Sequence, residues 1–229
     1  MKKIYMWILG TVSLFTTNSC GEGFLDVNHY DILDPEIVFS SEEYVNQGLN
    51  GLYDSFQPMT NSSVDIEQNW NIKPHLAFSN YPPLDCQADG WDNEFTRHAW
   101  MADKDMFEVA WQYAYRAISR ANTFLEQLKD ADTSLFAEGQ TGKDKIEAQA
   151  RGIRGYWYYY LAQNFGRVPM LKEGESYITT PSKPRAESLD ETYNFILSDL
   201  AYAADHLDWI PENGDYGRLT KGMALAYAA

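Results

Sequence analysis

The sequence predicts an all-α fold that carries one long irregular insertion. Apolar residues recur at three- and four-residue steps in several segments, which is the pattern of amphipathic helices. Residues 57–104 show no sustained periodicity and contain Pro58, Pro74, Pro82 and Pro83. Of the 229 residues, 45% are apolar and 15% aromatic, which is enough to build a core. We therefore expect a helical frame interrupted by an insert at residues 57–104.

The first twenty residues have the pattern of an export signal. Lys2 and Lys3 precede an apolar run over residues 4–15, and small polar residues then lead to Cys20. This run is too short for a spanning helix, which needs about 20 apolar residues. The segment indicates a bacterial lipoprotein signal at residues 1–19 with Cys20 as the lipidated first residue; an ordinary secretory signal is the alternative. Residues 20–40 lack periodicity, so we expect an extended tether there.

The frame begins with a helix after Ser41. Glu42 and Glu43 suit the first turn of a helix, and Val45, Leu49, Leu52 and Phe56 follow at helical spacing before Pro58. The strongest pattern covers residues 105–129, where apolar side chains, many of them alanines, form one stripe. Small residues in that stripe allow another helix to approach closely.

Three more helices are expected farther along the chain, over residues 144–165, over 187–207 and from about Arg218 onward. Gly152 and Gly155 lie inside the first of these, where each costs roughly 1 kcal/mol relative to Ala. We expect a close backbone contact at both glycines. The pattern is still apolar at Ala229, so the chain reads as an amino-terminal fragment. Antiparallel helix pairs with Ala and Tyr at the contacts predict degenerate tetratricopeptide-like repeats, although their spacing is uneven.

Composition excludes several classes of function. The chain has 33 acidic and 18 basic side chains and a formal charge of −15, which disfavours binding to nucleic acid or electrostatic adhesion to anionic lipid. Two cysteines and four histidines, without an HExxH pattern, form no recognisable zinc site. The scattered acids permit a calcium site but do not specify one. We expect no cofactor and no catalytic residue.

Four segments carry a family resemblance. They are the segment from Cys20 to Asp26, Leu49-Asn-Gly-Leu-Tyr53, the segment from Trp111 to Asn122 that ends Arg-Ala-Asn, and the segment from Arg151 to Leu161 followed by Phe165-Gly-Arg-Val-Pro169. In this order the chain resembles the amino-terminal part of the SusD/RagB family of Bacteroidetes outer-membrane lipoproteins. One departure is Gly155, which stands where Ala is common.

The resemblance implies a helical nutrient-binding protein built on tetratricopeptide-like helix pairs. It implies a location at the cell surface, held by the lipid anchor and associated with a SusC-like TonB-dependent transporter in the outer membrane. The ligand would be an oligosaccharide, or less often a peptide, that is captured and delivered to the transporter without chemistry.

The insert supplies the residue types that such a ligand needs. A pyranose ring has apolar C–H faces that aromatic rings can cover, and a rim of hydroxyls that carboxylates and amides can bond. We expect Trp91 and Trp100 to stack on the sugar, with Trp70 and Tyr81 as further platforms, and Asp92 and Asn93 to bond hydroxyls. The alternative is that these aromatic side chains pin the insert to the helices.

The aromatic and basic residues of the helix at 144–165 are expected to be structural and not to bind ligand. Tyr156 and the tyrosines at 158–160 point around the helix, so we expect most of them to pack in the core. Arg151 and Arg154 are expected to make structural ion pairs.

Two other functions remain open at this point. A glycoside hydrolase needs a carboxylate pair that flanks the scissile bond, and the insert has carboxylates, but no spacing selects a pair. A repeat scaffold would bind protein segments along its helix faces, independently of residues 57–104.

Overall fold

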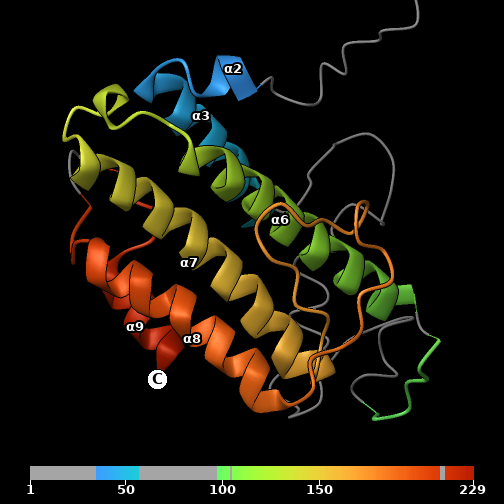
Figure 1. Cartoon of the computed structure of the whole chain (residues 1–229). Coiled ribbons are helices and arrows are strands. Elements are labelled where there is room, and N and C mark those ends of the chain that lie inside the picture. Colours follow the sequence, from blue (N-terminus) through green and yellow to red (C-terminus); the bar gives the residue numbers. More distant parts are fainter. Residues whose placement is uncertain (1–34, 57–96, 104, 212–214) are drawn as a thin grey trace, which may run out of the picture. The chain divides into compact units, whose positions relative to one another are not determined.

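The computed structural model describes residues 35–56, 97–103, 105–211 and 215–229, and these residues form helices with no β-strand among them (Figure 1). The expected all-α fold is confirmed. The α-helices are α2 (Pro35–Val38), α3 (Glu42–Tyr53), α6 (Asp105–Lys129), α7 (Gln140–Phe165), α8 (Leu189–His206) and α9 (Lys221–Ala228). Two 3-10 turns, η2 (Asp54–Phe56) and η6 (Thr133–Leu135), follow α3 and α6.

The start of the frame confirms one expectation and corrects another. The Ser41 hydroxyl accepts a hydrogen bond from the Tyr44 amide and caps α3, and Val45, Leu49 and Leu52 are buried, as the spacing predicted. Residues 35–38, however, form the helical turn α2 and are not the extended tether expected up to residue 40. Val38 is buried, and its side chain lies against Gly48 of α3. Burial of Val38 and the packing of Phe39 against Phe124 stabilise a turn that four residues cannot form alone.

Helices α6, α7 and α8 run side by side, and each is antiparallel to the next (Figure 1). The predicted stripe of α6 is buried, including Ala114, Ile118, Ala121 and Leu125. α3 covers one side of α6 and α7, and α9 packs on α8. The core is therefore a stack of helical hairpins, in keeping with the tetratricopeptide-like interpretation.

The two glycines of α7 mark close helix contacts, as expected. A Cβ at Gly152 would lie 2.7 Å from Cδ2 of Leu219 and 3.4 Å from Cβ of Ala203. A Cβ at Gly155 would lie 3.3 Å from Cβ of Asp199 and from Cδ2 of Leu200. Because α7 has only hydrogen atoms at these positions, α8 can approach its backbone closely.

Helix α7 begins at Gln140, four residues before the expected start. Residues 140–143 are mostly polar and therefore show no apolar periodicity, but tertiary contacts hold them in the helix. Lys143 Nζ donates hydrogen bonds to the carbonyls of Lys129 and Ala131, at 2.9 and 2.8 Å. Gly142 is buried against Phe136.

Helix α9 begins three residues after Arg218, where its start was expected. Thr220 caps α9 by accepting from the Met223 amide. Arg218 itself makes an ion pair with Asp215, 3.1 Å away, and the neighbouring Leu219 amide donates to the Tyr53 hydroxyl over 2.8 Å. The ion pair is local, whereas the Leu219–Tyr53 bond ties the segment before α9 to the end of α3.

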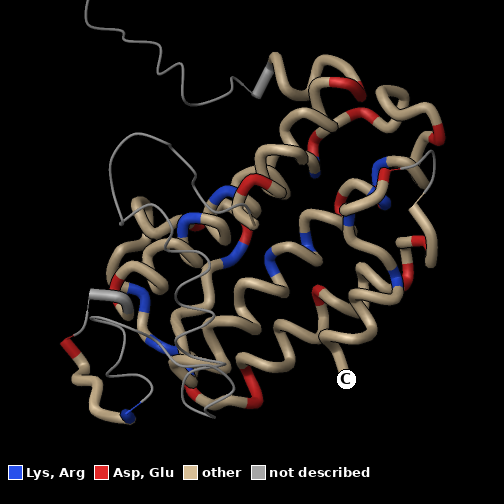
Figure 2. Tube along the Cα trace, turned by 180° about the vertical axis from the view of Figure 1, so that it is seen from behind, with Lys and Arg blue, Asp and Glu red and all other residues tan. Residues whose placement is uncertain are grey.

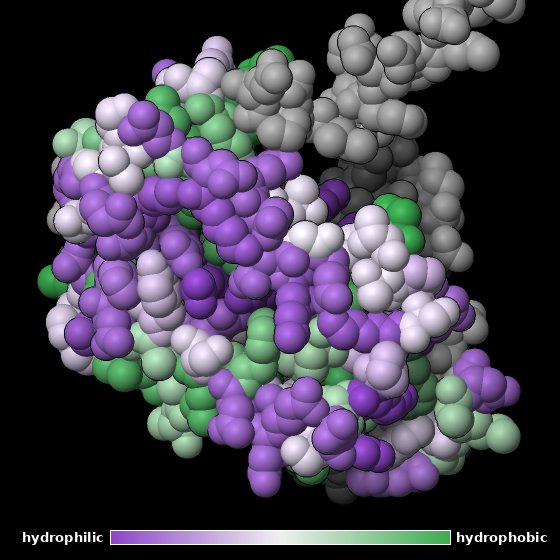
Figure 3. Space-filling view, in the orientation of Figure 1, coloured by the Kyte–Doolittle hydropathy of each residue, from purple (hydrophilic) through white to green (hydrophobic). Residues whose placement is uncertain are grey.

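Acidic and basic positions are interspersed along the described chain (Figure 2). The face shown in Figure 3 is mostly hydrophilic, with smaller apolar areas between the polar side chains. Within the described ranges, no helix combines the length and apolar character that crossing a bilayer requires.

Candidate functional site

The insert predicted as the binding site is described only at residues 97–103, which are not helical. Trp100 is the predicted platform within this range. Its side chain is 37% exposed, and its ring centroid lies 5.5 Å from that of His98. His98 has φ 54°, a left-handed conformation that costs free energy for a residue other than glycine. Trp100 therefore presents part of its indole to solvent at the end of the insert.

The other predicted residues lie outside the described part of the chain. These are the site residues Trp70, Tyr81, Trp91, Asp92 and Asn93, and the lipidation residue Cys20. Their roles remain predictions.

The tyrosines of α7 are core residues, as expected. Tyr158 is fully buried, donates from its hydroxyl to the Leu171 carbonyl and accepts from the Leu171 amide over 2.7 Å. Tyr160 is buried with its ring edge-on to Trp157, and Tyr156 and Tyr159 are partly buried against the same core. These rings pack between the helices.

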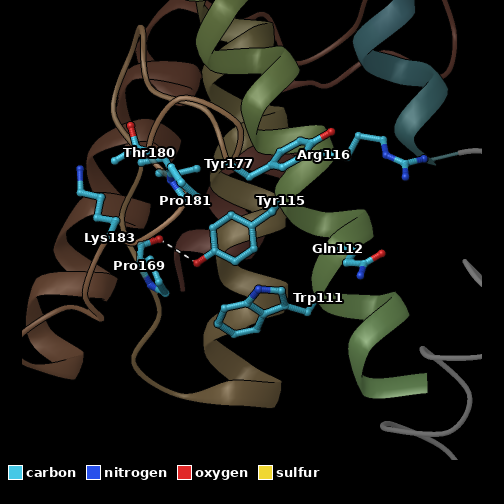
Figure 4. A pocket seen from close by; sticks show the side chains of 10 residues that line it. Trp111, Gln112, Tyr115, Arg116, Pro169, Tyr177, Thr180, Pro181 and Lys183 are labelled. Atoms are coloured by element: carbon cyan, nitrogen blue, oxygen red, sulfur yellow. Dashed lines mark hydrogen bonds between the residues drawn. The ribbon is translucent and has the colours of Figure 1, made fainter. Parts of the chain in front are cut away.

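A cavity of about 460 Å³ lies beside α6 (Figure 4). The segment between α7 and α8 crosses that helix in Figure 1. We call this segment, residues 166–188, the strap, and the cavity the α6 pocket. Helix α6 lines the pocket with Trp111, Gln112, Tyr115 and Arg116, and the strap lines it with Pro169, Leu171, Tyr177, Thr180, Pro181 and Lys183. Its size falls within the usual range of small-molecule sites.

Aromatic side chains form the floor of the α6 pocket. The Trp111 ring lies 4.9 Å from Tyr115 and meets Phe165 edge-on, with the ring planes 88° apart. The Arg185 guanidinium lies over the Trp111 ring, 5.4 Å from its centroid. The Tyr115 hydroxyl donates to the Pro169 carbonyl over 2.7 Å, as drawn in Figure 4. Burial raises the pKa of Tyr115 above its usual value, so its hydroxyl keeps this proton.

The strap is held in place by a buried ionic network around Arg154. This side chain makes a two-pronged contact with Asp199 of α8, Nε to Oδ2 at 2.7 Å and Nη2 to Oδ1 at 2.8 Å. Its Nη1 also donates to Asn122 of α6 and to Glu173 of the strap, at 2.8 and 2.6 Å. Asn122 in turn donates to the Glu175 carbonyl over 3.2 Å. One arginine thus joins α6, α7, α8 and the strap.

The charges of this network stabilise one another. Burial alone would lower the pKa of Arg154, but its contacts with Asp199 and Glu173 raise it. Burial also disfavours the charged form of Glu173 and by itself would raise its pKa, but the charge and the hydrogen bond of Arg154 lower the pKa of Glu173. Burial raises the pKa of Asp199, and its bonds to Arg154 oppose that rise. The expectation of structural ion pairs is confirmed for Arg154, and for Arg151, which pairs with Glu147 at 2.6 Å.

Sequence reasoning missed the α6 pocket for two reasons. Trp111 and Tyr115 fall in or next to the apolar stripe of a strong amphipathic helix, so they are interpreted as core. The strap has no periodicity that would place it over α6. The available signal was a run of 23 residues between two helices, residues 166–188, that combines prolines with charged side chains.

Comparison with known families gives an extensive match. Residues 23–229 match a SusD-like family model described as starch-binding and associating with the outer membrane. The chain belongs to the SusD-like family. Among curated relatives in this family, the SusD-like protein P2 of Formosa agariphila is 26% identical over 223 residues, covering 95% of this chain and 41% of the relative. A SusD-like protein of Bacteroides ovatus is 28% identical over 239 residues, covering 100% of this chain and 39% of the relative.

Solved SusD-like structures share the fold. A SusD-like carbohydrate-binding protein from Bacteroides fragilis matches with a TM-score of 0.64 at 21% identity, over 84% of this chain and 37% of that one. A laminarin-binding SusD-like protein matches with a TM-score of 0.62 at 23% identity, over 81% and 38%. The chain therefore spans about two fifths of the length of its SusD-like relatives.

Proposed function

We propose that the protein binds oligosaccharides at the bacterial cell surface and passes them unaltered to a SusC-like TonB-dependent transporter in the outer membrane. Membership of the SusD-like family supports this proposal most directly, because the family model is described as starch-binding and associating with the outer membrane. A solved relative with the same fold is named for laminarin binding. We infer the same class of ligand for this chain.

The proposed sugar platform is the insert at residues 57–104. The exposed indole of Trp100 offers the flat apolar face that a pyranose ring stacks on. The other proposed contacts are Trp91 as the second platform, Asp92 and Asn93 for hydroxyls, and Trp70 and Tyr81 as additional platforms.

A substitution at Trp100 tests this platform. Loss of one stacking face is worth about 1 kcal/mol, so Trp100→Ala in the intact protein should weaken glycan binding roughly fivefold. Binding is measured by calorimetry with the best ligand from a glycan array. Trp209→Ala is the matched control, since Trp209 is 65% exposed and lies far along the chain from the insert. If both variants lose glycan affinity equally, or if neither loses any, the proposal that the insert contributes to the binding site is contradicted.

The anchor has a separate test. We propose that Cys20 is lipidated and holds the protein at the outer membrane, because more than one acyl chain makes anchoring stable. Cys20→Ser should move the protein from the membrane fraction to the soluble fraction. Mass spectrometry of the mature amino-terminal peptide should show acyl chains on Cys20. A mature chain that starts after residue 20 would contradict the anchor.

The absence of chemistry is also part of the proposal. Incubation of the bound glycan with the intact protein should release no shorter product. Hydrolysis that disappears in Asp92→Asn would instead favour the glycoside hydrolase alternative.

A further inference from the structure

The α6 pocket differs in charge from two other cavities of the described chain. Those cavities are lined partly by acids, one by Glu42, Glu138 and Asp208 among others and the other by Asp215. The α6 pocket is lined by Arg116 and Lys183 and by no acid among the described residues. Acidic side chains outnumber basic ones 33 to 18 in this chain, so a cavity with only basic charges runs against the overall composition.

The two cations are available to different degrees. Arg116 is exposed on α6, and no hydrogen bond or ion pair engages its guanidinium within the described part of the chain. Lys183 is paired with Glu175, a strap residue that does not line the pocket. At the rim, Gln112 donates to Glu108 over 2.8 Å. Of the two lining cations, Lys183 thus has an acidic partner among the described residues and Arg116 has none there.

The arrangement suits a ring that carries a negative charge. In Figure 4, Lys183 lies on the strap side and Arg116 on the α6 side of Tyr115 and Tyr177, and both basic side chains extend outward from the two rings. Tyr177 is 46% exposed, so its ring is accessible from the pocket. Aromatic rings can cover the apolar face of a sugar, and a guanidinium matches the two oxygens of a carboxylate or sulfate. Walls of low polarity strengthen such a charge interaction.

We propose that the α6 pocket binds an anionic sugar residue, one bearing a carboxylate or a sulfate ester, with Arg116 as its main charge partner. The inference rests on the proposed function and adds a substrate class to it. It also adds a second subsite, formed by α6 and the strap and distinct in sequence from the insert.

Calorimetry on the intact protein at low salt tests the proposal with three probes. Oligogalacturonate presents carboxylates, sulfated galactan oligosaccharides present sulfates, and laminarin oligosaccharides are neutral. At least one anionic probe should bind, and Arg116→Gln should weaken that binding about tenfold while leaving laminarin binding unchanged. Added salt should weaken the anionic probe alone. The anionic probe that binds identifies the charged group, carboxylate or sulfate ester, that the α6 pocket recognises.

Two further variants sharpen the test. Arg120→Gln is the matched control, because Arg120 is exposed one turn farther along α6 and does not line the pocket; it should bind like the unmodified protein. Glu175→Gln releases Lys183 from its acidic partner and should tighten binding of the anionic probe. Thermal unfolding of each variant confirms that the fold is intact.

The outcomes separate this inference from the proposed function. If Arg116→Gln leaves the affinity for the anionic probe unchanged, or if only neutral probes bind, the proposal of an anionic subsite is wrong and the proposed function is unaffected. If no glycan of either kind binds the intact protein, the proposed function fails as well.

Discussion

The Arg154 network supports a quantitative prediction about stability. Arg154 and Asp199 are both 1% exposed and are joined by two charge-assisted hydrogen bonds of 2.7 and 2.8 Å. Arg154→Met removes the cation that makes both hydrogen bonds and leaves the buried Asp199 carboxylate with only the more distant guanidinium of Arg151, 3.8 Å away. Breaking a buried pair in this way costs about 3–5 kcal/mol, against total stabilities of about 5–15 kcal/mol. The free energy of unfolding should therefore fall by about that amount.

Urea unfolding followed by circular dichroism measures the effect. Arg151→Met is the matched control, since Arg151 lies three residues away on the same helix but its side chain is 29% exposed. Its pair with Glu147 is partly solvated, and its contact with Asp199 is long, at 3.8 Å, so this substitution should cost about 1 kcal/mol or less. The double variant Arg154→Met with Asp199→Leu should recover most of the loss, because neither charge is then buried.

The pH dependence gives an independent check. Burial raises the pKa of Asp199, and Arg154 opposes that rise. Without Arg154 the carboxyl is more easily protonated in the folded state than in the unfolded chain, so the single variant should regain stability as pH falls. The reasoning is refuted if Arg154→Met costs no more than Arg151→Met, or if the double variant is as unstable as the single.

Two further predictions concern close packing and buried tyrosines. Gly152→Ala would place a Cβ 2.7 Å from Cδ2 of Leu219 and should lower the free energy of unfolding by about 1 kcal/mol, because overpacking outweighs the gain in helix propensity. Gly51→Ala, where a Cβ would meet nothing within 4 Å, should raise the free energy of unfolding by about 0.5–1 kcal/mol. Changes of the same sign in the two variants would contradict this contrast. Burial raises the pKa of Tyr53 and of Tyr156 to about 12. Their contribution to stability should be complete below about pH 10, where unfolded tyrosine ionises, and should be lost as pH rises toward about 12. Ultraviolet absorbance follows the ionisation of the tyrosines at alkaline pH, and the free energy of unfolding is measured at about pH 9 and at rising pH toward about 12. An unchanged free energy of unfolding across that range would contradict the prediction.

The helices were predictable where local patterns decide them. The stripe at residues 105–129 matches α6 at both ends, because α6 is long, strongly amphipathic and bounded by polar residues. The starts of α7 and α9 were displaced by a few residues, since Lys143 bonds to carbonyls after α6 and Arg218 donates to Asn50 of α3. Such contacts override weak local preferences.

The candidate sites were predictable only in part. Arg154 could be assigned to ion pairing from the sequence, but its partners come from three other segments. The α6 pocket was not predicted at all, because its two walls are residues 111–116 and 169–183, which are separated by an entire helix.

The sequence by itself determined the class of fold, the span of α6 and the family resemblance, because apolar periodicity and short motifs are local in the chain. Only the tertiary structure decided which helices meet at Gly152 and Gly155, which carboxylates neutralise Arg154, and where a basic cavity opens in an acidic protein. The physical reason is that the strap has no periodic pattern of its own. Its path over α6 is set by burial and by hydrogen bonds to Tyr115, Ser119 and Asn122 of α6, which lie far from the strap in the sequence.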